Sequence, residues 1–355
     1  MPLLQLPPET LHAIFAYVGS SFFHADLRRL TVSKQWLAFA LPRCLACIGL
    51  SQRTLRSLVS SGDQQTLAPL KNTLESLDLT LTGYPGPAAA RYLDAYPLSL
   101  ELDDVQPPGA SPDPPRYETW FRVLQHDLAR LAAIARQARK LRALRIRACC
   151  HAALPVPASQ MEDYLSRATL QSLLSMDHLH VLVLDTTVGL RASPGERDDH
   201  GHVCPAVAAL LPSLGILHLR MCRICPDALA VQGPVRSLRL REVIVNLSLL
   251  DNRPGITSAA HARRCGPAGA GMLQLQADIH KQAEALADRM AAPKTVRIVS
   301  HSLPDFRVHA LDVLTGTMMV LEDGTPWNED GKVVEDSEPE SEFSDSASSS
   351  RADEE

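Results

Sequence analysis

The sequence predicts an α + α/β fold class, in which a small helical N-terminal segment precedes a long α/β domain and an acidic tail. Three observations predict these parts. Six of the 16 aromatic residues lie within the first 40 positions, a leucine pattern recurs after residue 70, and 13 acidic residues occur from Glu322 onward. Each observation belongs to one stretch of the chain, so the average composition describes none of the three.

The overall composition is that of an ordinary globular protein. The 355 residues are 45% hydrophobic and 21% charged, and the length suggests about two domains. Eight cysteines are too few for a secreted disulfide scaffold, and the first residues do not read as a signal peptide. No apolar run reaches the roughly 18 residues that a membrane helix needs. We therefore expect a cytoplasmic and/or nuclear protein without a membrane segment.

The first 50 residues are expected to form three short helices. The first opens at Pro7 and Pro8 and ends at Gly19, with apolar residues at helix spacing in between: Leu11, Ile14, Phe15 and Val18. A second helix follows from Asp26, and a third runs through Phe39 toward Pro42 and carries Cys44 and Cys47. Three helices this short leave part of their apolar surface for a partner.

This segment resembles an F-box over residues 3–50. The resemblance rests on a Leu-Pro start, a Glu two residues after the proline, an Ile-Phe pair and a Val-x-Lys-x-Trp stretch, in LPPETLHAIFAYV and DLRRLTVSKQW. The link GSSFFHAD departs from the proline-rich turn of many F-boxes. The alternative is that the same residues are simply the core of a helical domain.

The F-box resemblance implies that domain 1–50 binds the Skp adaptor, and through it the cullin and RING subunits of a ubiquitin ligase. Carried over position by position, it implies these adaptor contacts: Leu6, Pro7, Ile14, Phe15, Leu30, Val32 and Trp36.

After residue 70, an apolar residue is repeatedly followed by others at +3, +5 and +8. Copies start at Leu74, Leu141, Leu179, Leu214 and Val235, with weaker copies at 100–105 and 296–301. The pattern resembles the strand segment of leucine-rich repeats. Helical stripes at 120–135 and 272–290 separate some copies, whose starts differ by 67, 38, 35 and 21 residues.

We therefore expect residues 51–321 to form an irregular leucine-rich-repeat-like α/β solenoid, with an ordinary α/β domain as the alternative. An F-box followed by such repeats is a familiar pairing in which the repeats bind the protein to be ubiquitinated. The stretch from Val296 to Asp336 also resembles the closing segment of F-box proteins from filamentous fungi.

Arginine outnumbers lysine 29 to 6 and alternates with inward leucines in several copies. The candidate contacts to an acidic or phosphorylated target are Arg145, Arg147, Arg220, Arg239 and Arg241. A solvated strand face is the alternative. The arginines are scattered and do not form a basic stripe, so we expect no nucleic-acid partner.

The tail, residues 322–355, carries a local charge of −11, so the preceding 321 residues carry +6. It is rich in serine and poor in apolar residues, and we expect it to be disordered.

The chain offers few residues in catalytic or metal-binding patterns. Cys44/Cys47 and Cys222/Cys225 form two Cys-x-x-Cys pairs 175 residues apart, and the set of His200, His202 and Cys204 lacks a fourth group. We therefore expect no metal, no cofactor and no catalytic residue. The resulting prediction is a non-catalytic substrate-recognition subunit of a Skp-cullin-F-box ligase with an unknown protein substrate; the alternative is an interaction scaffold without ligase function.

Overall fold

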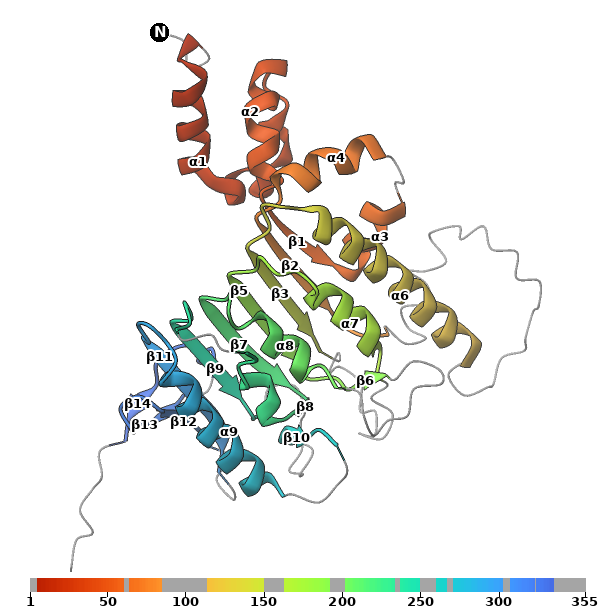
Figure 1. Ribbon diagram of the computed structural model, residues 1–355. Coiled ribbons are helices and arrows are strands. Elements are labelled where there is room, and N and C mark those ends of the chain that lie inside the picture. Colours follow the sequence, from red (N-terminus) through yellow and green to blue (C-terminus); the bar gives the residue numbers. More distant parts are fainter. Residues whose placement is uncertain are drawn as a thin grey trace, which may run out of the picture.

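The computed structural model describes residues 5–60, 64–84, 114–149, 163–191, 202–233, 237–249, 260–266, 271–302, 307–322 and 324–334. Over these residues the protein is a mixed α/β fold with eight α-helices and a ten-stranded, mostly parallel sheet. Helices α6, α7, α8 and α9 lie in a row on one face of this sheet (Figure 1). No described helix is long and apolar enough to cross a membrane.

The strands of the large sheet follow one another in chain order. The first seven, which pair in parallel, are β1 (Cys47–Ser51), β2 (Ser76–Leu81), β3 (Ala143–Ala148), β5 (Val181–Thr186), β7 (Ile216–Met221), β9 (Glu242–Asn246) and β11 (Thr295–His301). The last three, which pair antiparallel, are β12 (Val308–Asp312), β13 (Met318–Leu321) and β14 (Lys332–Val333). Parallel neighbours require long connections, which explains why helices separate most of them.

The helices after β1 are α3 (Gln52–Ser60), α4 (Gln64–Thr73), α6 (Pro114–Gln137), α7 (Arg167–Leu174), α8 (Cys204–Leu210), the 3₁₀ helix η5 (Pro226–Leu229) and α9 (Met272–Ala287). Two short strand pairs lie outside the large sheet: β4 (Leu165–Ser166) with β6 (Leu190–Arg191), and β8 (Arg223–Ile224) with β10 (Arg263–Arg264). The helices predicted at 120–135 and 272–290 are thus confirmed.

The leucine pattern produces two rows of buried side chains that run across neighbouring strands. Leu77, Leu144, Leu182 and Leu217 are cross-strand neighbours, and each is at most 1% exposed. The next row is Leu79, Ile146, Leu184 and Leu219, with equally low exposure. These residues belong to one continuous core shared with the helices, which confirms the strands predicted from Leu74, Leu141, Leu179 and Leu214.

The copy predicted from Val235 is wrong by five residues. Strand β9 pairs Val243 with Leu217 and Val245 with Leu219, so the pattern starts at Leu240. Both starts place apolar residues at +3 and +5, and only pairing with the neighbouring strand decides between them. The weaker copy at 296–301 is confirmed as β11. The weaker copy at 100–105 lies outside the described residues.

The N-terminal helical module, residues 5–44, contains α1 (Pro8–Ala25), the 3₁₀ helix η2 (Leu27–Leu30) and α2 (Lys34–Cys44). The first helical stretch ends at Gly19 as predicted: its backbone is non-helical, with a φ of 76°, so α1 consists of two helical stretches joined at a kink. The predicted third helix is the end of α2, which continues through Pro42. Cys47 is not on a helix, because β1 begins there.

The module has its own small core, separate from that of the sheet. Its buried members are Leu11, Phe15, Phe23, Ala40 and Cys44. The helices α1 and α2 lie beyond the β1 end of the sheet (Figure 1).

Part of the tail predicted to be disordered is ordered. Strand β14 pairs with β13, and the side chain of Trp327 packs against a third cluster that contains Ile244 and Val299. This segment is held by backbone pairing with β13 and by the side chain of Trp327, neither of which its acidic composition indicated. Residues 335–355 lie outside the described residues.

Candidate functional site

Exposed apolar side chains gather on the N-terminal helical module. Among the described residues, ten large apolar side chains are strongly exposed, and half of them lie in this short module. We call these five the apolar docking surface: Tyr17, Phe22, Leu27, Val32 and Leu37, with exposures of 95%, 40%, 61%, 66% and 38%. A concentration of this kind on a small helical unit is typical of surfaces that bind another protein.

The seven residues that the F-box resemblance selects differ in exposure and fall into three groups. Pro7 and Val32 are exposed. Four others are half-buried and keep part of their surface accessible: Leu6, Ile14, Leu30 and Trp36. Of these, Leu6, Leu30 and Trp36 pack against the module core.

Phe15 differs from the other implied contacts because it is only 1% exposed. Its ring packs 4.7 Å from that of Trp36 and 6.0 Å from that of Phe23, measured between centroids. Phe15 therefore holds α1 against α2 and offers no surface to a partner in this structure. Tyr17 and Phe22 were missed as surface residues; the apolar link GSSFFHAD was the available signal for Phe22.

The face of the sheet opposite helices α6–α9 carries polar residues from alternate strand positions, and we call it the helix-free face. Arg145 lies here opposite Asp78, with Nη1 3.2 Å from the carboxylate, and both side chains are about half-exposed. Arg147 is also exposed, with Nε 3.7 Å from the Asp185 carboxylate. These two arginines project from the face as predicted.

Arg220 does not project into solvent, which corrects the expectation that it is an exposed target contact. Its Nε and Nη2 donate to the two oxygens of Asp185 at 2.7 and 2.8 Å, and the residue is 7% exposed. The indole of Trp327 lies over its guanidinium, 5.7 Å from the ring centroid. The C-terminal segment thus covers this part of the helix-free face.

Further C-terminal contacts lie on the same covered part. Arg297 donates to the Glu329 carbonyl oxygen at 2.6 Å and pairs with Asp330. Beside it, His218 contacts Glu242 at 2.6 Å and lies under the Trp327 ring. Burial lowers the pKa of His218, although Glu242 opposes the shift.

Arg239 and Arg241 lie elsewhere. Both are exposed, but they precede β9, and the Arg241 amide donates to the Gly215 carbonyl where the strands begin. The five candidate arginines therefore do not form one surface.

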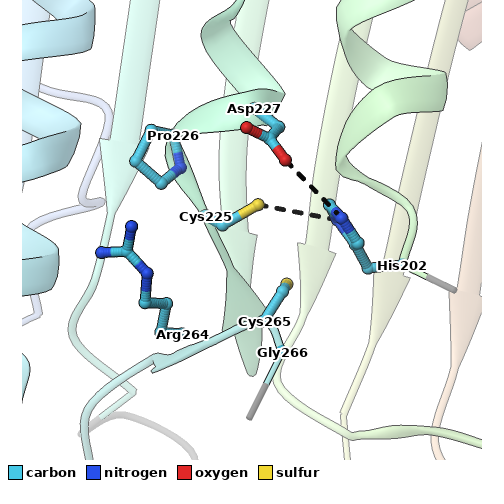
Figure 2. Close-up of a pocket in the computed structure, with 7 residues that line it drawn as sticks. All are labelled: His202, Cys225, Pro226, Asp227, Arg264, Cys265 and Gly266. Carbon is cyan, nitrogen blue, oxygen red and sulfur yellow. Dashed lines mark hydrogen bonds and ion pairs between the residues drawn. The ribbon is translucent and has the colours of Figure 1, made fainter. Parts of the chain in front are cut away.

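A second group of polar side chains converges beside the carboxyl ends of the strands. His202, Cys204, Cys225 and Cys265 each offer one ligand atom, and these four atoms all lie within 4.8 Å of one another. We call them the Cys₃His cluster. Figure 2 shows Cys225, Cys265 and His202 turned toward one space, with the Asp227 carboxylate also directed at the imidazole.

Local structure explains why these residues meet. Cys204 is the first residue of α8, and His202 lies two residues before it. Cys225 directly follows β8 and Cys265 directly follows β10. Because β8 and β10 pair in parallel, with Arg264 opposite Ile224, the next residues of both strands are also neighbours.

The three thiols are electrostatically unequal. Hydrogen bonds from Cys204 and then Cys225 lower the pKa of Cys265 to about 4, with help from Arg223. Hydrogen bonds to Cys225 and Cys265, together with burial, raise the pKa of Cys204 well above its usual value.

The Cys₃His cluster has four potential ligands, whereas the predicted set of His200, His202 and Cys204 had three. His202 and Cys204 are brought together with Cys225 and Cys265, whereas His200 lies outside the described residues. The two Cys-x-x-Cys pairs do not form one site: Cys44 is buried in the N-terminal module, and Cys47 is on β1.

No protein-family model matches the chain, and no curated protein matches it.

Proposed function

We propose that the protein is a non-catalytic substrate-recognition subunit of a Skp-cullin-F-box ubiquitin ligase. The N-terminal helical module docks on the Skp adaptor, and the α/β domain binds the protein to be modified. The observation that carries this proposal is the apolar docking surface, which occupies the same short segment as the F-box-like sequence. The ligase would then act by proximity, since holding a target near the conjugating enzyme raises its effective concentration.

The architecture of the α/β domain supports the second half of the proposal. Its strands follow in chain order with helices on one face, which is compatible with an irregular leucine-rich-repeat solenoid. Such solenoids bind partners with exposed side chains of their sheet or loops. Arg145 and Arg147 keep exposed guanidinium groups on the uncovered part of the helix-free face, where an acidic or phosphorylated segment would find charged donors.

Adaptor binding is the direct test. We expect Leu27→Asp and Val32→Asp to weaken binding of the purified Skp adaptor to the full chain by at least about tenfold, which corresponds to ~1.4 kcal/mol. Val333→Asp is the matched control, because Val333 is similarly exposed, at 59%, but lies on β14. Neither Leu27 nor Val32 belongs to the buried core of the module, so its helices should persist, as circular dichroism would verify.

Two results would change the proposal. Unchanged adaptor affinity in both module variants, with the control also unchanged, would remove the adaptor from the function. Adaptor binding without recruitment of a cullin into the purified complex would leave an interaction scaffold that does not act in ubiquitin transfer.

A further inference from the structure

We propose that His202, Cys204, Cys225 and Cys265 bind one zinc ion as a structural Cys₃His site. This function is independent of adaptor docking, since the cluster lies at the carboxyl ends of the strands and the docking surface lies on α1, η2, α2 and their links. Three cysteines and one histidine are a common ligand set of structural zinc sites.

The distances between the side chains fit a tetrahedral ion. With Zn–S bonds of about 2.3 Å and a Zn–N bond of about 2.0 Å, tetrahedral geometry requires S···S separations of roughly 3.8 Å and S···N separations of roughly 3.5 Å. The Sγ atoms of Cys204 and Cys265 are 3.8 Å apart. The Cys225 Sγ and the His202 Nδ1 are 3.6 Å apart. These two edges of the tetrahedron are therefore already at the required length.

The histidine is oriented as a zinc ligand. Its Nδ1 faces the thiols, while its Nε2 lies 3.7 Å from the Asp227 carboxylate. A carboxylate on the outer nitrogen fixes the imidazole so that the inner nitrogen keeps a free lone pair for the metal. Asp227 therefore acts as a positioning residue for His202.

The charges also suit a divalent cation. Three thiolates with one Zn²⁺ carry a net charge of −1, and Arg223 and Arg264 flank the cysteines on β8 and β10. Asp278 already pairs with Arg264, whereas the charge of Arg223 acts on the Cys265 thiol.

A disulfide and simple apolar packing are the two competing roles for these buried or half-buried cysteines, and the geometry weighs against both. A disulfide needs the two sulfur atoms about 2.05 Å apart, and bonding Cys204 to Cys265 would leave Cys225 and His202 without a role. Packing alone accounts for small apolar thiols but not for an imidazole and a carboxylate aimed at them. A single zinc ion uses all four groups at once.

The site would be structural because its four protein ligands leave no open position for water or substrate. Zinc would tie together the start of α8, the end of β8 and the end of β10. The strand pair β8–β10 is only two residues long on each side, so it has few bonds of its own to hold it.

Metal content of the purified full chain tests the proposal. We expect inductively coupled plasma mass spectrometry to find about one zinc ion per wild-type chain. The Cys265→Ser variant should lose most of this zinc. Cys222→Ser is the matched control, because Cys222 lies three residues before Cys225 and outside the cluster. Asp227→Asn should keep zinc at saturation but weaken the affinity by about 10- to 100-fold in a chelator competition.

A second measurement covers the case in which Cys265→Ser fails to fold. In the native wild-type chain, alkylation should spare Cys204, Cys225 and Cys265 when zinc is bound, and a strong chelator should make all three reactive. The proposal would be overturned if the purified chain contained no zinc and did not bind zinc ions from added zinc chloride. A Cys204–Cys265 disulfide that forms under reducing conditions, or equal zinc loss in Cys222→Ser and Cys265→Ser, would also overturn it.

Discussion

The helix-free face contains two ion pairs of the same design in different surroundings. Arg145 faces Asp78 across β3 and β2, and Arg220 faces Asp185 across β7 and β5. The side chains of the first pair are 46% and 53% exposed, and those of the second are 8% and 6% exposed. The difference comes from the C-terminal segment, whose Trp327 covers the second pair only.

The comparison shows that burial, not sequence position, decides what such an arginine does. An exposed pair is screened by water and contributes little to stability, so Arg145 remains available to a partner. A buried pair has lost its hydration, and each partner depends on the other. Arg220 is therefore a structural residue, although it lies on the same face of the sheet as Arg145 and in register with the exposed Arg147.

Breaking the buried pair should have the largest effect. Arg220→Met leaves the Asp185 carboxylate without its bidentate partner, and we expect the free energy of unfolding to fall by about 3 to 5 kcal/mol in urea titrations. Arg145→Met is the matched change on the exposed half and should cost about 0 to 1 kcal/mol. Equal costs at the two sites would show that the two halves of the face are not energetically distinct.

Removing the cover should have an intermediate effect. Trp327→Ala loses a half-buried indole and its contact with Arg220, so we expect a loss of about 1 to 2 kcal/mol. Trp327→Phe keeps an aromatic ring in this place and should recover most of the loss. An alanine variant as stable as the wild type would mean that the segment rests on the sheet without stabilising it.

The smallest effect is a pH dependence at the same end of the sheet. Burial, and then the charge of His261, lowers the pKa of His301 to about 4. An unfolded histidine binds a proton below about pH 6.5, so between that pH and about 4 the unfolded chain binds more protons than the native one. Stability should therefore fall as the pH is lowered through this interval.

His301→Asn provides the comparison for the pH series. Asparagine can still hydrogen-bond to Ser248, which contacts the His301 Nδ1 at 2.8 Å, but it does not titrate. We expect the variant to lose on the order of 1 kcal/mol less than the wild type between pH 7 and pH 5, by denaturant midpoints at each pH. Parallel curves for both proteins would assign the pH dependence to other groups.

Much of the fold could be predicted because inward residues follow a simple period. The pattern from Leu214 predicted that Leu217 and Leu219 point into the core, and both are buried in the structure. It failed at Val235 because Leu240 and Val243 fit two overlapping starts, and the choice depends on a neighbouring strand. It also could not separate Arg145 from Arg220, since alternation tells which face a side chain takes but not what covers that face.

The Cys₃His cluster could be predicted only in part. His202 and Cys204 are close in sequence, and both are residue types that bind metals. Cys265 is 61 residues from Cys204, and the pairing that brings it close involves strands of two residues, too short to leave a sequence pattern. The adaptor contacts show the reverse problem, because a motif selects Phe15 whether its side chain is exposed or buried.

The strands of the large sheet lie side by side in the same order as in the sequence, and this order has a consequence for biosynthesis. Within the large sheet, from β1 to β14, each new strand pairs with the preceding strand of that sheet. A chain leaving the ribosome can therefore add strands to a growing edge without waiting for a distant partner, even though parallel pairs close long loops and form slowly. Among the described strands of this sheet, the final antiparallel ones make the most local pairs, so its last-made part should also be the quickest to form.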